Sequence, residues 1–276
     1  MRSFFSAAAA LVALVLAGVS VPVVWADRTV IDQDGFLAMA TPLGNDAKFQ
    51  QALATATAKT MSSKLDAVPA FSAMAQPLIE NVTKSITTDP GYPAAWSETL
   101  RRSHELTLVD PAANANDQGA LNLDVAPLMQ LIFNKLGAGF GQQLKAPSQV
   151  LISLGTPSQR EALVKLREFV SMGIWLALGA LVAAILALLI ARRRSTTLAL
   201  IGLGGLVVVA GWKLSLSLLS QNVLNATAAD PVAELFKQEY VAAAGGSFDF
   251  WILCGLIVAA SLLLIGLIGR LAARRR

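Results

Sequence analysis

The chain has 276 residues, of which 55% are hydrophobic, and its formal net charge is +4. Soluble proteins use about 45–50% apolar residues, so this composition predicts membrane-spanning segments. The single cysteine, Cys254, excludes a disulfide framework and a cysteine-based zinc site.

Four apolar runs lie along the chain, and none of them contains a carboxylate. Each is long enough to cross a hydrocarbon core of about 30 Å, which takes about 20 helical residues. We therefore predict four transmembrane helices. They are an N-terminal anchor within residues 1–26 and three later helices at about 169–191, 197–219 and 249–270.

The first run has a second interpretation, as a cleaved signal peptide, because Val24-Trp25-Ala26 resembles a small-residue cleavage site. Its apolar run of about 21 residues exceeds the usual 7–15 of a signal core, which favours a retained anchor. Cleavage would leave three crossings, with the following domain still outside.

The arginines set the expected orientation. Those that flank helix ends fall on one side of a four-pass arrangement, which the positive-inside rule makes cytoplasmic: Arg2, residues 192–194, Arg270 and residues 274–276. Both termini are then cytoplasmic, and residues 27–168 and 220–248 are extracytoplasmic. The segment from Asp27 to Glu168 holds 14 acidic and 12 basic residues, so the net positive charge reflects topology and we expect no nucleic-acid partner.

Residues 27–168 are expected to form a mainly helical domain with one small β-sheet. Apolar periodicity and turn residues predict its elements. They are helices from Asn45 or Asp46 to Val68, from about Ala70 to Ile86 and from Ala94 to Leu108, a polar turn at 114–119, a half-buried strand at 121–125, a short helix at 126–136 that ends at Gly137-Ala138-Gly139, and a second strand at 150–152.

The segment from Thr156 to Arg194 is predicted to be one unbroken helix that leaves this domain and enters the membrane. Thr156, Pro157 and Gln159 form the pattern of a capping box at its start. An uncharged stretch, Phe169 to Ile190, then crosses the bilayer. Such a helix would couple the domain to the membrane as a stiff stalk.

Several short motifs resemble an uncharacterised family of four-pass envelope proteins from actinobacteria. They are residues 32–36, Thr41-Pro42-Leu43-Gly44-Asn45-Asp46, Trp96 followed by Arg102 and His104, and Leu121-Asn122-Leu123-Asp124 followed by Pro127-Leu128. The resemblance implies the same anchor, extracytoplasmic helical domain and membrane hairpins. It implies no particular activity.

His104, the only histidine, shares one helical face with Trp96, at eight residues' spacing. One interpretation is a general base or ligand in an aromatic pocket, and the other is a buried, hydrogen-bonded structural histidine. No serine-hydrolase elbow, zinc-protease motif or phosphate loop accompanies it. We expect no catalytic residues, cofactor or metal.

Two basic positions are further candidates. Arg102, with Arg101, could receive a phosphate or lipid head group, or it could pair with Glu98 across one helical turn. Lys213 is the one charge within an apolar run, so it is either a functional group in the membrane or a lysine that snorkels to the outer interface.

Gly202, Gly204, Gly205 and Gly211 give the third apolar run a face of small residues. Such faces allow two helix backbones to approach closely. The contact could lie within the protein or be made with a helix of a partner.

The sequence thus predicts a non-catalytic, multi-pass protein of the bacterial cell envelope that binds or scaffolds a partner or membrane complex. Its partners would be the lipid bilayer and another membrane protein. Two alternatives remain: an accessory subunit of a transporter or channel, with Lys213 at an outer vestibule, and an enzyme that acts on an envelope lipid or glycan around His104.

Overall fold

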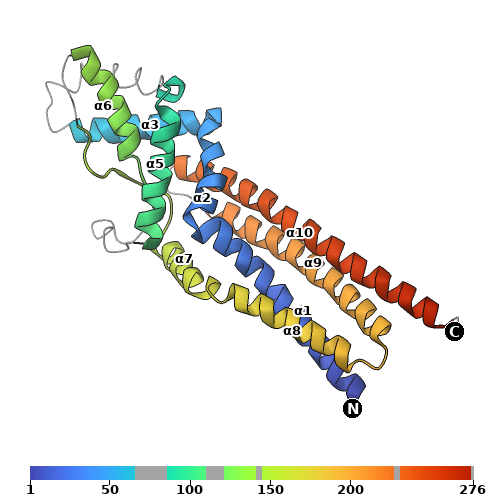
Figure 1. Ribbon diagram of the computed structural model, residues 1–276. Coiled ribbons are helices and arrows are strands. Elements are labelled where there is room, and N and C mark those ends of the chain that lie inside the picture. Colours follow the sequence, from blue (N-terminus) through green and yellow to red (C-terminus); the bar gives the residue numbers. More distant parts are fainter. Residues whose placement is uncertain (66–85, 110–120, 141–144, 227–230, 275–276) are drawn as a thin grey trace. The chain divides into compact units, whose positions relative to one another are not determined.

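The architecture comes from a computed structural model of the chain, which describes residues 1–65, 86–109, 121–140, 145–226 and 231–274 (Figure 1). The fold is mainly α-helical with one small sheet, as predicted. The chain divides into two compact units. We call Met1–Ile31, Leu166–Val223 and Ala244–Arg276 the bundle, and Asp32–Lys165 with Leu224–Ala243 the helical domain.

Four helices carry the apolar runs: α1 (Arg2–Ala26), α8 (Gly173–Ile190), α9 (Arg194–Asn225) and α10 (Pro231–Arg274). A π-helical turn, Asp27–Ile31, continues α1. Within the described part of the chain, these four helices are long and apolar enough to span a membrane. The prediction of four membrane-spanning helices is confirmed, and the architecture is that of a multi-pass membrane protein.

Small side chains fill the inside of the bundle. Ala10, Ala13, Ala180 and Ala187 are buried, whereas large apolar side chains such as Trp175 are exposed. Lipid is as apolar as leucine, so membrane helices associate through close packing of small residues instead of by hiding large ones. This distribution of residues is therefore what a lipid-facing bundle requires.

The predicted unbroken helix from Thr156 to Arg194 is wrong. The structure has α7 (Pro157–Val170), a turn at residues 171–172, and then α8. The helix breaks where it meets α1: Val170 is buried against Val23, and a Cβ added to Gly173 would lie 2.8 Å from Val23 Cγ1. The turn brings the start of α8 close to α1, and the expected stiff stalk is replaced by two helices.

The start of α7 is as predicted. Thr156 N–H donates to Gln159 Oε1 at 2.8 Å, and Gln159 N–H donates to Thr156 Oγ1 at 3.3 Å. These two reciprocal bonds make a complete capping box.

The helical domain holds four helices among its described residues besides the first parts of α7 and α10. They are α2 (Gln33–Ala40), α3 (Ala47–Leu65), α5 (Tyr92–His104) and α6 (Ala126–Phe140), with short helical turns at Thr41–Asn45, Ile86–Thr88 and Glu105–Val109. Strands β1 (Asn122–Asp124) and β2 (Leu151–Ser153) pair antiparallel. Their core centres on Phe49, Trp96 and Leu100.

Most predicted elements of this domain are present, with two differences. The predicted break at Gly137-Ala138-Gly139 is wrong, because α6 continues to Phe140; a helical glycine costs only about 1 kcal/mol, which packing can offset. All three β1 residues are buried instead of alternating. The predicted helix before Ile86, up to residue 85, and the predicted turn at 114–119 lie outside the described residues.

The helical domain also includes the start of α10, which lies far along the chain. Val232 is fully buried in its core. The ring centroid of Phe236 lies 6.2 Å from that of Phe49, and the ring centroid of Tyr240 lies 5.9 Å from that of Phe36. The compact unit is thus larger than the predicted 27–168, because residues 224–243 join it.

Candidate functional site

The face of α5 that was predicted to carry a site is packed into the core. Trp96, Leu100 and His104 are 1%, 0% and 6% exposed. The indole N–H of Trp96 donates to the carbonyl oxygen of Thr41 at 3.1 Å. A Cβ added to Gly44 would overlap the indole ring, so the chain turns closely around Trp96. Trp96 is a core residue that fixes this turn.

His104 lies among aromatic rings. The centroid of its imidazole is 5.1 Å from that of Phe36, which in turn contacts Tyr240. With only 6% of the residue exposed, little imidazole surface is open to a substrate. This environment favours the structural interpretation of His104 over that of a general base.

Asp124 is the polar residue that sequence reasoning did not single out. Its Oδ1 accepts hydrogen bonds from the backbone N–H of Ala126 at 3.1 Å and of Val150 at 2.9 Å. Its own backbone N–H donates to Ser103 Oγ at 2.9 Å, and that hydroxyl donates to the carbonyl of Thr99. Asp124 thereby joins β1 to the start of α6, to the residue before β2 and to α5. Its role is structural.

Arg102 and Arg101 both bind Glu98. Arg102 Nε donates to Glu98 Oε1 at 2.8 Å, and Arg101 donates from Nε and Nη2 at 2.8 and 2.7 Å. These hydrogen bonds lower the pKa of Glu98 to about 2, because they stabilise its ionised form. The predicted Glu98–Arg102 pair is present. Because the guanidinium of Arg102 already binds Glu98, it is less available to a phosphate group.

Lys213 does not stand alone in the bundle. Its Nζ lies 2.6 Å from Oδ1 of Asp249, the residue just before the fourth apolar run, and both side chains are at least half exposed. The sequence did not suggest this pair, since the two residues are 36 positions apart. The pair neutralises the charge that had made Lys213 a candidate for transport.

The glycines of α9 face different neighbours. A Cβ at Gly202 would overlap the backbone of Leu263 in α10, and one at Gly205 would lie 3.0 Å from Cβ of Ala259. A Cβ at Gly204 would overlap the Leu14 side chain of α1, whereas one at Gly211 would meet nothing within 4 Å. Three of the four glycines therefore serve packing inside the bundle, and Gly211 alone leaves room beside the helix.

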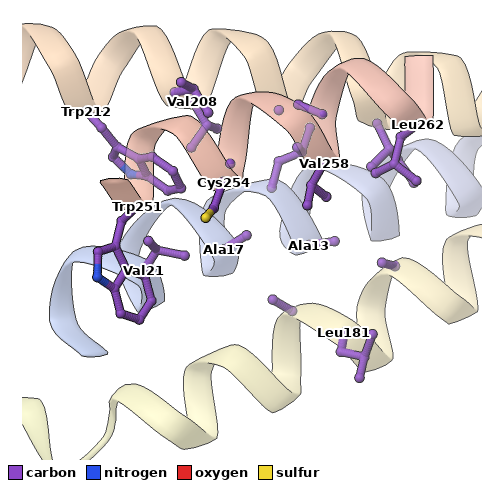
Figure 2. A pocket seen from close by; sticks show the side chains of 18 residues that line it. Ala13, Ala17, Val21, Leu181, Val208, Trp212, Trp251, Cys254, Val258 and Leu262 are labelled. Atoms are coloured by element: carbon purple, nitrogen blue, oxygen red, sulfur yellow. The ribbon is translucent and has the colours of Figure 1, made fainter. Parts of the chain in front are cut away.

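The helices of the bundle line an elongated cavity of about 450 Å³ that is open on one side (Figure 2). All four membrane helices contribute to its wall. Small residues create the space, among them Ala13, Ala17, Ala184 and Gly255, and Trp212 and Trp251 lie at one end. The indole N–H of Trp212 donates to the carbonyl of Gly18 at 2.8 Å.

No group of three or more histidine, cysteine or acidic side chains able to hold a metal occurs in the described ranges. Comparisons of the chain with protein-family models, with curated proteins and with solved structures find no match.

Proposed function

We propose that the chain is a non-catalytic, multi-pass protein of the cell envelope whose helical domain, on the extracytoplasmic side, binds a partner or a membrane complex. The observation that carries this proposal is that polar side chains of the helical domain bind one another or the backbone. Asp124, Glu98 and Arg102 bind one another or the backbone, and His104 packs against aromatic rings. A well-packed domain whose polar side chains serve its own fold is suited to presenting a surface.

The orientation rests on charge. Basic residues occur at the N-terminus of α1, between α8 and α9, and at the C-terminus of α10. By the positive-inside rule these ends are cytoplasmic, which puts the helical domain outside.

No specific observation favours the two alternatives. Ion transport would call for a polar path at membrane depth, whereas the cavity in the bundle has an apolar wall and Lys213 is paired with Asp249. Catalysis would call for an accessible reactive group, and His104 is buried.

The test is purification of the full chain from its native membranes in a mild detergent, followed by intact-mass measurement and identification of bound protein. We expect one partner in fixed stoichiometry. A chain that purifies alone with a homogeneous mass would contradict the proposal.

Two variants locate the contact. Gly211→Leu fills the open space beside α9 and should leave the fold intact, because its Cβ would meet no neighbour. The double variant Gly204→Leu/Gly205→Leu should disturb bundle packing itself. If Gly211→Leu retains the partner, the face of α9 at Gly211 is not the contact, as the proposal expects. If it releases the partner without loss of thermal stability, α9 makes the contact and the helical domain does not.

A further inference from the structure

The wall of the bundle cavity excludes polar occupants. It includes no charged residue and no hydroxyl or carboxamide side chain. The N–H of Trp212 is already bonded to Gly18. The indole N–H of Trp251 and the thiol of Cys254 are the remaining polar groups of the wall. Water or an ion in this space would lose most of its hydrogen bonds, which is strongly unfavourable. The occupant must be apolar.

The cavity is long and narrow. Its wall extends from Ile201 to Trp212 on α9 and from Trp251 to Leu262 on α10, eleven residue steps in each, or about 16 Å at about 1.5 Å per residue. A helix with side chains is about 10–12 Å across, so a cavity of about 450 Å³ spread over this length suits a slimmer occupant. The shape therefore favours a slim, flexible chain.

The cavity is open toward the outside of the bundle. Leu181 and Val258, which contribute to its wall, are 58% and 59% exposed. In a membrane, these side chains contact lipid. The cavity is therefore continuous with the hydrocarbon phase around the bundle, and its length of about 16 Å matches one leaflet, which is half of a core of about 30 Å.

We propose that this cavity is a lipid site that holds one acyl chain of a membrane phospholipid. The chain would lie along α9 and α10, with the polar part of the lipid at the end where Trp212 and Trp251 lie, since tryptophan prefers the membrane interface. The acyl chain would make van der Waals contacts with the side chains of the cavity wall, which lack these contacts when the cavity is empty. The inference depends on the bundle being in a bilayer and not on the partner-binding function.

The first experiment measures lipid retained by the full chain. The protein is purified from native membranes in a mild detergent, and bound lipid is identified by mass spectrometry of the intact complex. We expect about one phospholipid per chain. Ala17→Phe/Ala184→Phe, which fills the cavity, should reduce retention at least tenfold, whereas Ala210→Phe, on the exposed surface of α9 outside the cavity, should retain it.

Equal retention by the two variants, or no lipid on the native chain, would overturn the proposal. So would a different bound molecule that the cavity variant displaces, such as an isoprenoid. A bound protein partner bears on the proposed function alone, because it would be seen by its own mass whether or not a phospholipid is present.

A second experiment uses the unaltered chain, so it does not depend on the folding of a variant. The protein is reconstituted in phosphatidylglycerol vesicles that contain a small share of lipid with a photoreactive diazirine in its acyl chain. Val207 is 68% exposed on α9 and any surrounding lipid can label it, whereas Val209, on the cavity wall, is 7% exposed. We expect adducts at both positions; labelling of Val207 without Val209 would overturn the proposal.

Discussion

Glu98 shows that spacing along one helix can predict an ion pair. Its pairing with Arg102 follows from their separation by four residues on one helix, and the structure adds Arg101 to the pair. Asp124 shows the opposite case, because its partners come from α5, α6 and β2. No spacing rule brings those segments together, so its role was visible only in the fold.

The pairing of Glu98 predicts a pH-dependent contribution to stability. Because the pKa falls from 4.5 to about 2 on folding, the ionised carboxylate stabilises the folded state. The contribution is complete above pH 4.5 and is lost as the pH falls toward about 2. Each helical ion pair contributes about 0.3–0.5 kcal/mol at a partly exposed position.

Thermal unfolding of the full chain in detergent tests this contribution. Glu98→Gln should be less stable than the native chain at pH 6, and the difference should shrink as the pH is lowered through the range that the pKa shift defines. A difference between the two proteins that stays constant down to pH 2.5 would contradict the assignment.

At the scale of elements, the start of α7 was predicted correctly, but the break after it was not, and α10 starts at Pro231 instead of at about residue 249. The capping box of α7 depends on residues three positions apart, so the sequence contains it whole. The break after Val170 depends on α1, which approaches Gly173 closely. Glycines within α6 and α9 likewise do not end those helices.

Removal of the cap should loosen the start of α7. Thr156→Ala is expected to cost about 1 kcal/mol of local stability, because the N–H of Gln159 loses its acceptor. Hydrogen exchange of the full chain in detergent should then be faster in the first turn of α7.

The matched control is Thr55→Ala in α3. Thr55 is exposed and its hydroxyl donates to the carbonyl of Gln51 within the same helix. It caps no helix end, so exchange in α3 should hardly change. Equal effects of the two substitutions would show that the capping box does not hold α7.

At the scale of the whole molecule, the helical domain is completed by a late part of the chain. Phe236 and Tyr240 of α10 stack with their rings 5.6 Å apart, and Phe236 also packs on Phe49. Some 190 residues separate Phe49 from Phe236. Contacts at this separation make the folding of the helical domain depend on the first part of α10, which comes late in the sequence.

Phe236→Ala should therefore destabilise the helical domain although it lies far from α3 in the sequence. Truncation of a half-buried phenylalanine is expected to cost about 2–3 kcal/mol. Hydrogen exchange in α3 should become faster, since Phe49 loses a neighbour. Phe250→Ala, at a position that is 67% exposed, is the control and should leave α3 unchanged. Unaltered exchange in α3 of the Phe236 variant would contradict this dependence.

The sequence by itself determined the four membrane-spanning helices, the mainly helical class, the small sheet and the start of α7. Each of these depends on signals within about 20 consecutive residues: apolar length, alternation and caps. The tertiary structure alone decided the Lys213–Asp249 pair, the tasks of Asp124 and the glycines, the inclusion of residues 224–243 in the helical domain, and the cavity. These depend on where helices distant in sequence meet, because an ion pair, a close backbone approach or an empty volume belongs to two or more segments at once.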